Sequence, residues 1–511
     1  MSGLPRGWIN TSLDDVCQIV RGITFPTSEK RFESGEGLIA CLRTANVQAR
    51  VEWDDLWFVP REYVKSDEQL VDLDDILIST ANSYELVGKV SRITYKKFNS
   101  TLGAFISLLR AHKEIDAGFL YYQMSSETVQ RLIREMSSTT TNISNVSGGK
   151  LKTLELQIAP AAEQTRIVAK LEELLSDLDA GVAELKAAQK KLAQYRQSLL
   201  KAAVEGALTA EWRKQHPVTE SGAQLLARIL QERRARWEAK QLGKFAEQGK
   251  PPPKDWQKKY HEPVQPDTTD LPELPEGWVW ASVEQISEIQ GGIQMQPSRV
   301  PVENKYPFLR VANVARGKLK LDDVHEIELF SGELERLALV VGDVLIVEGN
   351  GSLTEIGRCA LWDGSIPNAV HQNHLIRVRP IGVVSQFVET WLNSLGGIDK
   401  LTKLAATTSG LYTLSVGKIA KIPVPIAPRS EQEAAMQVLI DGLSVVESQE
   451  QSVELALKQS TAQRQNILRA AFAGQLVPQD PNDEPANVLL ERIRAERAQR
   501  AATPKARGRK V

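Results

Sequence analysis

The stretch LPEGWVWASVEQISEIQGGI at residues 274–293 decides the fold of this chain, because a similar stretch, LPRGWINTSLDDVCQIVRGI, already stands at residues 4–23. Further matched pairs follow in the same order, each about 270 residues apart: CLRTANV (41–47) with FLRVANV (308–314), DDILIST (74–80) with GDVLIVE (342–348), SGGKLKTLELQIAPAAEQ (147–164) with SVGKIAKIPVPIAPRSEQ (415–432), and YRQSLLKAAVEGALT (195–209) with QRQNILRAAFAGQLV (463–477). Ordered matches at a nearly constant spacing indicate a tandem duplication rather than chance similarity of composition.

Composition places the chain among globular proteins of two or more domains, with 511 residues, 42% hydrophobic and 25% charged. The net charge of −1 argues against a highly basic nucleic-acid binder of the histone type, although residues 211–270 carry 12 Lys and Arg against 9 Asp and Glu. There is no apolar run of about 18 residues and no signal-peptide pattern at the N-terminus, so we expect a cytoplasmic protein with no membrane segment.

Each repeat has a β-rich first part, in which short β-branched runs such as DDILIST and GDVLIVE alternate with Gly, Asn and Ser clusters. Some helix is expected as well, as in GFLYYQMSSETVQRLIREM (118–136). The fold class is therefore predicted to be α+β.

A long helix is predicted after the proline of each IAP, at 158–160 and at 426–428. The first would run from Ala161 to a stop at Gly206, about 69 Å. Its expected apolar stripe is Leu171, Leu174, Leu178, Val182, Leu185, Leu192, Tyr195, Leu199 and Ala202, and the thinner second stripe is Leu439, Val446, Val453, Leu457 and Ile467. We expect the two stripes to pair as an antiparallel coiled coil, with a pseudo-two-fold axis relating the two β-rich domains.

Each long helix is followed by a tail, residues 220–240 and 483–502, in which a short apolar stripe precedes dense charge. Two interpretations stay open: a solvated helix docked on its own long helix, or an arm for a partner subunit. The proline-rich, polar residues 249–275 have the composition of a linker between the halves.

Catalytic and cofactor motifs are missing from the sequence. SNVSGGKLK (144–152) lacks the first glycine of a phosphate-binding loop, and EGNGSLTEIG (348–357) diverges from GxGxxG. The tetrapeptide by which amino-methyltransferases hold their target base is also absent, so the chain is not a methylase by itself. We assign no catalytic residue, no metal and no cofactor.

Three apparent metal or thiol motifs have simpler explanations. HQNH (371–374) has no third ligand nearby and is expected to be ordinary loop or strand. Asp72, Asp74 and Asp75 lack the calcium-loop pattern and are expected to form a turn before a strand. Cys17, Cys41 and Cys359 are too isolated for a zinc ribbon or a disulfide framework and are expected to be buried thiols.

Two β-rich units, each followed by a long helix, with IAPxxEQ at the junction and EGALT (205–209) or GQLVPQDPNDEPA (474–486) at the exit, resemble the DNA-specificity subunit of type I restriction-modification systems. The resemblance covers essentially the whole chain. It implies that each β-rich unit is a target recognition domain that reads one half of a bipartite site in double-stranded DNA, with the helices as a spacer. It also implies two methylation subunits bound to this scaffold, and restriction subunits that join through them.

The resemblance implies a division into six segments. They are target recognition domain 1 (1–160), a central spacer helix (161–210), a helical arm and linker (211–273), target recognition domain 2 (274–428), a distal spacer helix (429–477) and a C-terminal tail helix (478–511).

Candidate DNA-binding residues come from polar loops at equivalent places in the two copies. The shared motif supplies Arg43, Asn46, Arg310 and Asn313, which suit guanine and adenine but fit equally well as framework or phosphate contacts. Loops that differ between the copies are better candidates for specificity, and they supply Ser83, Tyr84, Lys89, Thr140 and Asn142 in the first copy and Asn350, Ser352, Arg358, Gln372, Asn373, Ser409 and Tyr412 in the second.

Two rival interpretations remain. A fused restriction-methylation enzyme would need methylase and nuclease motifs that the sequence lacks. A duplicated coiled-coil adaptor that binds only proteins would show no sequence preference for DNA.

Overall fold

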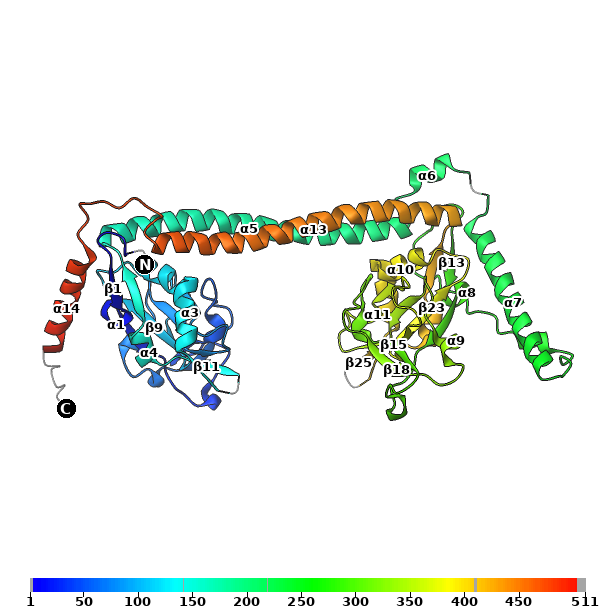
Figure 1. Ribbon diagram of the computed structural model, residues 1–511, viewed down its shortest axis with the longest axis horizontal. Helices are drawn as coiled ribbons and strands as arrows, with labels where there is room; N and C mark the ends of the chain where they lie inside the picture. Colours follow the sequence, from blue (N-terminus) through cyan, green and yellow to red (C-terminus); the bar gives the residue numbers. More distant parts are fainter. Residues whose placement is uncertain (1–2, 141, 218, 409–410, 503–511) are drawn as a thin grey trace. The chain divides into compact units, whose positions relative to one another are not determined.

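The computed structural model describes residues 3–140, 142–217, 219–408 and 411–502 (Figure 1). The chain divides into two compact units, Met1–Lys186 with Glu454–Val511, and Ala187–Val453. Unit 1 contains the first β-rich part, here called head 1 (residues 3–160), and unit 2 contains the second, head 2 (residues 274–428). Each unit also contains a piece of both long helices, so the sequence repeat and the compact unit have different boundaries.

Head 1 is built on an antiparallel four-stranded sheet of order β2-β9-β5-β7. Its strands are β2 (Cys17–Arg21), β9 (Ile106–Ala111), β5 (Ile76–Ser79) and β7 (Val90–Arg92). The other sheets are β4-β3-β8 (Trp57–Pro60, Leu38–Leu42, Ser100–Leu102), β1-β12 (Ile9–Ser12, Glu155–Ile158) and β10-β11-β6 (Ser138–Thr140, Ile143–Asn145, Ala81–Asn82). The α-helices are α1 (Leu13–Val16), α2 (Ala117–Ser125), α3 (Glu127–Met136) and α4 (Gly148–Lys152).

Head 2 repeats this arrangement, with the main sheet in the order β14-β23-β19-β21. Those strands are β14 (Ser287–Gly291), β23 (Leu375–Pro380), β19 (Val344–Val347) and β21 (Cys359–Leu361). The other sheets are β18-β15-β22 (His325–Glu328, Lys305–Leu309, Val370–His371), β13-β26 (Val279–Ser282, Pro423–Ile426), β20-β25-β24 (Gly349–Asn350, Leu411–Thr413, Ala406–Thr408) and β16-β17 (Val314–Ala315, Lys318–Leu319). The α-helices are α8 (Val283–Ile286), α9 (Glu333–Leu337), α10 (Ser385–Asn393), α11 (Leu395–Leu404) and α12 (Val416–Ala420).

The strands β5 and β19 inside the main sheets are buried along their whole length and are apolar except at Ser79, because they are covered on both faces. In β5, Ile76 and Ile78 join a core cluster with the helix residue Phe119, whereas Leu77 joins a second cluster with Phe58 of β4. The alternate residues of β19 divide in the same way between two clusters of head 2. The motifs DDILIST and GDVLIVE are therefore the buried centres of the two heads.

The most similar motifs of the two repeats meet in space, where each head joins a long helix. The indole Nε1 of Trp8 donates to the Glu163 carboxylate at 3.0 Å, and Trp278 donates to Glu431 at 3.0 Å. Both carboxylates are 1% exposed. The GW and IAPxxEQ motifs are thus two halves of one buried joint, which explains why both occur twice.

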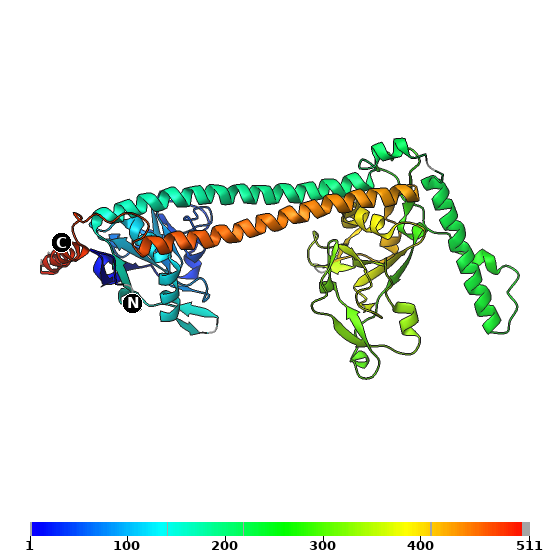
Figure 2. The same cartoon turned by 45° about the horizontal axis from the view of Figure 1, so that its top comes forward.

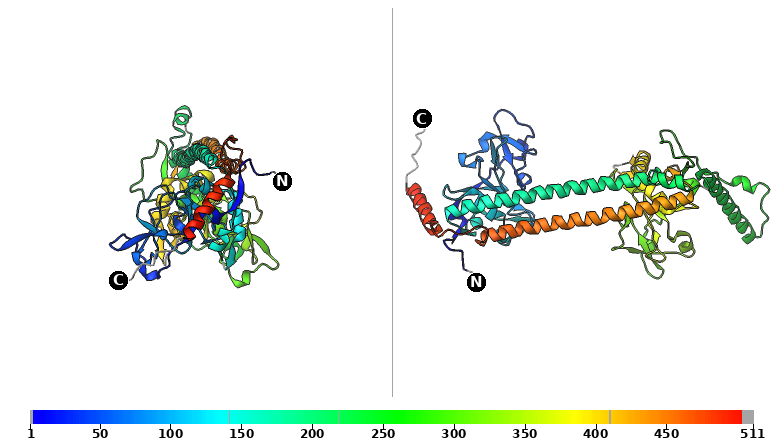
Figure 3. Two further views of the ribbon diagram at one scale, coloured as in Figure 1. Left: turned by 90° about the vertical axis from the view of Figure 1, so that its left-hand side faces the viewer. Right: turned by 90° about the horizontal axis from the view of Figure 1, so that it is seen from above.

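The long helices are α5 (Ala161–Val204) and α13 (Arg429–Phe472). In unit 1 the first part of α5 packs against the last part of α13, with Leu171 and Leu468 in one core (Figure 3). In unit 2 the last part of α5 packs against the first part of α13, with Leu199 and Val446 in one core. The pairing is therefore antiparallel, as predicted.

Ion pairs between the two helices support the same pairing. Asp179 of α5 pairs with Arg464 of α13 in unit 1, and Arg196 of α5 pairs with Glu450 of α13 at 2.9 Å in unit 2. Gly206 has a left-handed φ of 77° just after α5, where the sequence predicts the stop. The placement of Tyr195 in the buried stripe was wrong, because its side chain is 54% exposed.

Each tail helix packs against the head of the other repeat. The reason is that α5 begins in unit 1 and ends in unit 2, whereas α13 begins in unit 2 and ends in unit 1. After α5 and the short α6 (Ala210–Gln215), α7 (Gly222–Glu247) buries Leu225 and Ile229 in the core of head 2 (Figure 2). After α13, α14 (Ala486–Ala502) buries Leu489 and Ile493 in the core of head 1. The expectation of a tail docked on its own long helix is corrected, because the apolar stripes belong to the heads.

The two docking contacts share two equivalent hydrogen bonds. The backbone N–H of Gly222 donates to the Gly277 carbonyl at 2.7 Å, and that of Ala486 donates to the Gly7 carbonyl at 2.8 Å. The guanidinium of Arg233 donates to the carbonyl of Ser287 at 2.6 Å, and that of Arg497 donates to the carbonyl of Cys17 at 3.2 Å. The duplication therefore includes the tails.

The pH dependence of stability should carry a contribution from Glu389 of α10, which is 9% exposed and accepts a hydrogen bond from Asn393. Burial raises the pKa of Glu389 to about 7 from 4.5. Because the unfolded chain ionises first, this carboxyl lowers stability progressively as pH rises from about 4.5 to about 7, by about 3 kcal/mol in total.

Glu389→Gln tests this contribution, because the amide does not ionise. We expect the difference in unfolding free energy between the variant and the parent chain to grow in favour of the variant over this pH window and to level off above it. Urea unfolding at pH 4.5, 6 and 8 measures the difference. A constant difference across these pH values would contradict the prediction.

Candidate nucleic-acid interface

A small polar ribbon at the end of head 1 brings together most of its candidate residues. Strand β11 lies between β10 and β6, with Ser144 opposite both Thr139 and Asn82. Ser83 directly follows β6, Thr140 ends β10, and Asn142 occupies the connecting turn in a left-handed conformation with φ of 69°. Ser83, Tyr84, Thr140 and Asn142 are all exposed, Tyr84 at 48%. We call β6, β10, β11 and residues 83–84 and 142 ribbon 1.

Head 2 carries an equivalent ribbon of β20, β25 and β24, here called ribbon 2 together with residues 351–352. Asn350 lies opposite Tyr412, which lies opposite Thr407 on its other side. Ser352 is exposed and the Tyr412 side chain is half-buried. Ser409, the remaining candidate here, lies outside the described residues.

The shared LRxANV motif (residues 42–47 and 309–314) forms a turn, here called the bracket, in which the asparagine side chain is hydrogen-bonded to the backbone. In head 1, Asn46 is fully buried; its Oδ1 accepts from the backbone N–H of Arg43 at 2.8 Å, and its Nδ2 donates to the carbonyls of Glu52 and Asp55 at 2.9 Å. The Arg43 guanidinium pairs with the Asp55 carboxylate and lies 4.9 Å from the centre of the Trp57 ring. These contacts favour the framework interpretation for head 1.

Head 2 repeats the bracket. Asn313 is 2% exposed, accepts from the backbone N–H of Arg310 at 2.8 Å, and donates to the carbonyls of Lys320 and Asp323 at 2.8 Å. Arg310 pairs with the Asp323 carboxylate at 2.7 Å. Neither buried asparagine has a donor left for a base.

Lys89 and Arg358 occupy equivalent places but differ in how much of each side chain is free. Within the part of the chain that the structure describes, the ammonium of Lys89 donates one hydrogen bond, to Oε1 of Gln48 at 2.5 Å. The guanidinium of Arg358 donates to the carbonyls of Val314 at 2.6 Å and Val311 at 3.0 Å, and pairs with Glu355 at 3.0 Å. Arg358 is therefore held within the head, whereas Lys89 is the more available cation.

Gln372 and Asn373 lie in the loop after β22, and both are half-buried. The backbone N–H of Gln372 donates to the Leu309 carbonyl, and that of Asn373 donates to the Ile293 carbonyl, both at 2.9 Å. The histidines flanking them differ. His371 is buried, its Nδ1 is 3.0 Å from the Leu375 carbonyl, and burial lowers its pKa to about 4, whereas His374 is 53% exposed. No group of three or more His, Cys, Asp or Glu that could hold a metal occurs in the described residues.

Sequence reasoning missed a groove of about 490 Å³ beside ribbon 1. Phe105, 66% exposed, and the exposed Arg21 line it, together with Asn145 and Ser138 of the ribbon. Lys150 donates to the Ser138 hydroxyl at 3.0 Å. The signal was present, because the loop that holds Phe105 is equivalent to the one that holds Gln372 and Asn373 and differs from it in sequence.

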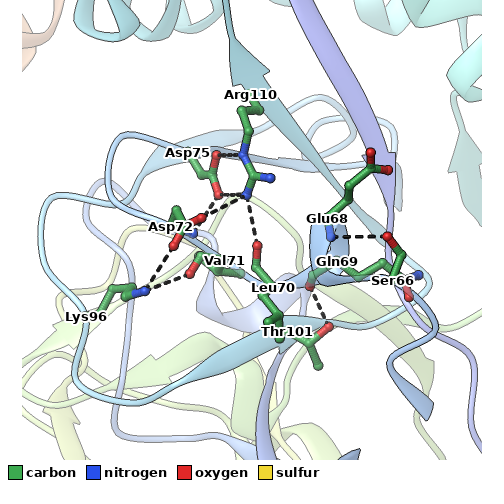
Figure 4. Close-up of polar contacts among 10 residues, drawn as sticks. All are labelled: Ser66, Glu68, Gln69, Leu70, Val71, Asp72, Asp75, Lys96, Thr101 and Arg110. Atoms are coloured by element: carbon green, nitrogen blue, oxygen red, sulfur yellow. Dashed lines mark hydrogen bonds and ion pairs between the residues drawn. The ribbon is translucent and has the colours of Figure 1, made fainter. Parts of the chain in front are cut away.

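The strand that leads into ribbon 1 is fixed at its start by a buried ion pair (Figure 4). The Asp75 carboxylate, on a residue that is 2% exposed, accepts hydrogen bonds from Nε and Nη2 of Arg110 at 2.8 and 2.7 Å. It also accepts one from the backbone N–H of Asp72 at 2.7 Å. The Arg110 Nη2 also donates to the carbonyl of Leu70 at 2.9 Å. The acidic run is thus the turn before β5, as expected from the sequence.

Comparisons with known proteins agree with the resemblance. Residues 5–188 match the protein family described as the type I restriction modification DNA specificity domain. The chain is 26% identical over 507 residues to the type I restriction enzyme EcoKI specificity subunit of Escherichia coli K12, covering 97% of this chain and 96% of that protein. It is 24% identical over 506 residues to the StySPI specificity subunit of Salmonella potsdam, with the same coverage.

The fold also has a solved counterpart. A chain from a structure on complex assembly and conformational transition of the type I R-M system superposes with a TM-score of 0.63 at 15% identity, covering 93% of this chain and 100% of that one. Among the described residues, no helix is long and apolar enough to cross a membrane.

Proposed function

We propose that this chain, a member of the family of DNA-specificity subunits of type I restriction-modification systems, is the subunit that recognises the DNA target. Each head reads one half of a bipartite site. The similarity to specificity subunits along nearly the whole chain supports this role over that of a coiled-coil adaptor that binds only proteins.

The observation that carries the proposal is the pair of ribbons. The two heads share their buried strands, their joints and their brackets, yet the exposed loops of the ribbons differ in sequence. Each ribbon contains a pair of adjacent antiparallel strands, β10-β11 or β24-β25. A two-stranded β-ribbon fits the major groove of B-DNA, where each base pair presents a distinct pattern of donors and acceptors. A common frame with two different polar ribbons is what two different half-sites require.

For the described residues, the proposed roles rest on exposure and hydrogen bonding, whereas Ser409, which lies outside them, is proposed from the sequence alone. We propose that the base edges are read by Ser83, Tyr84, Thr140 and Asn142 of head 1 and by Asn350, Ser352, Gln372, Asn373, Ser409 and Tyr412 of head 2. Lys89 is assigned to a phosphate, which fixes position rather than sequence. Arg43, Asn46, Arg310, Asn313 and Arg358 are assigned to the frame that holds the ribbons.

The chain is proposed to act without catalytic residues of its own. Methylation subunits, two in number, would bind the scaffold of long helices and supply the transferase chemistry, and restriction subunits would join through them. The antiparallel helices would set the length of DNA between the half-sites, much as dimer geometry sets half-site spacing in two-fold DNA-binding proteins. The six segments named from the sequence are proposed as the functional division.

Exchanging residues 1–150 for the corresponding residues of another specificity subunit tests the proposal. We expect one half of the methylated motif to change, with the other half and the spacer length kept, because head 2 and the long helices are unaltered. Mapping methylated positions across the genome of a host that expresses the hybrid measures this. A change in both halves would refute independent reading by the two heads.

A further inference from the structure

A basic extension on α7 is not used by the proposed reading of bases. Residues 234–260, here called the basic arm, comprise the C-terminal half of α7 and the segment through η5 (Trp256–Lys259) that folds back on it. The arm has eight Lys and Arg against three Asp and Glu, a net charge of +5, in a chain whose net charge is −1. Positive charge is therefore concentrated in this short segment.

The arm is held in shape by its aromatic side chains. The rings of Trp237 and Trp256 stack with centroids 5.7 Å apart, Tyr260 meets Trp237 edge-on at 5.4 Å, and Phe245 meets Trp256 at 6.0 Å. Because these rings pack on one another, the arm is a folded feature rather than a free linker. This corrects the sequence-based expectation of a linker beginning at residue 249, at least as far as Tyr260.

The cations of the arm are largely unpaired. Some have acidic partners: Arg234 pairs with Glu238 at 3.2 Å, and Lys258 pairs with Asp255 at 3.0 Å. Five exposed lysines have no acidic group within 4 Å among the described residues, namely Lys240, Lys244, Lys250, Lys254 and Lys259. Five ammonium groups without internal partners are available for an external anion.

The composition of the arm favours a polyanion over a protein surface. Protein interfaces are depleted in Lys and enriched in aromatic residues. The aromatic rings of the arm pack against one another instead of facing a partner. Lysine binds phosphate as a point charge without demanding a fixed geometry. Figure 1 shows α7 slanting away from head 2, with its C-terminal end at the level of β18 and α9.

We propose that the basic arm binds the phosphate backbone of duplex DNA beside the half-site read by head 2. This inference rests on the proposed function and adds a contact that does not depend on base sequence. Because each neutralised phosphate releases bound counterions, the arm should steepen the salt dependence of DNA binding by about 0.9 in log–log slope for each contact.

The test replaces the five unpaired lysines by glutamine in the full chain, assembled with its methylation subunits. DNA binding is measured from about 50 to about 300 mM KCl, on a duplex with both half-sites and on one with neither. We expect weaker binding to both duplexes and a shallower salt slope, by about 2–4.5. The ratio of the two affinities should stay the same, because base contacts are untouched.

A matched variant with arginine at the same five positions keeps the charge and should retain the parent slope. An unchanged slope in the glutamine variant would overturn the proposal. So would loss of methylation-subunit binding at an unchanged slope, which would place a protein on the arm. If the parent complex itself shows no preference between the duplexes, the proposed function fails instead, whatever the arm does.

Discussion

Replacing Arg379 by methionine should lower the free energy of unfolding by about 3–5 kcal/mol, because it leaves a buried carboxylate without its counter-ion. Asp343 is fully buried, and its two oxygens accept from Nε and Nη2 of Arg379 at 2.6 and 2.7 Å. Oδ2 of Asp343 also accepts from the backbone N–H of Val340 at 2.8 Å, which fixes the turn before β19. Thermal and urea unfolding of the full chain measure the loss.

The fork geometry of this pair provides the control. Arg379→Lys keeps the positive charge but cannot donate two parallel hydrogen bonds. It should therefore lower the free energy of unfolding, but by less than Arg379→Met does. The equivalent substitution in head 1, Arg110→Met, should act similarly, because Asp75 is held in the same way. Arg379→Met and Arg110→Met variants as stable as the parent chain would show that these carboxylates do not need a cation.

Much of this fold could be predicted because the chain contains two copies of each signal. A motif that occurs twice at a constant spacing separates required residues from incidental ones, so the long helices, their antiparallel pairing and the β-rich character of the heads could be predicted from the sequence. The stop at Gly206 also followed, because a left-handed residue after a helix favours glycine.

Features that depend on contacts between distant segments could not be predicted. The tail stripes at Leu225 and Leu489 were recognised as apolar, but periodicity does not say which surface covers them, and each helix crossed to the other repeat's head. Tyr195 fits the helical spacing, yet its side chain is 54% exposed, although the adjacent Arg196 pairs with Glu450 of α13.

The candidate interface also contains features that the sequence could not predict, because they depend on contacts seen only in the structure. Asn46 and Asn313 were selected for their base-reading chemistry, and only the structure shows that the backbone consumes their donors and acceptors. The loop of Phe105 could have been selected because it differs from the equivalent loop of Gln372 and Asn373, but the 66% exposure of the Phe105 side chain is known only from the structure.

A triple substitution in ribbon 1 should remove most of the discrimination at one half-site while leaving the other half-site intact. The proposed changes are Tyr84→Ala, Thr140→Val and Asn142→Gly. Glycine at residue 142 preserves the left-handed turn at φ of 69°, and valine keeps the shape of threonine, so the hairpin should retain its conformation. What is lost is an aromatic ring, a hydroxyl and a carboxamide on the exposed face of the ribbon.

The expected size follows from the cost of a lost base contact, about 1–3 kcal/mol or about 5- to 150-fold each. Methylation rates of the assembled complex would be compared on the cognate site and on sites with one altered base in either half. Discrimination should fall only in the half read by head 1, because ribbon 2 is unchanged and serves as the internal control. Undiminished discrimination in both halves would remove ribbon 1 from the interface, and an equal fall in both would show that the two heads do not read independently.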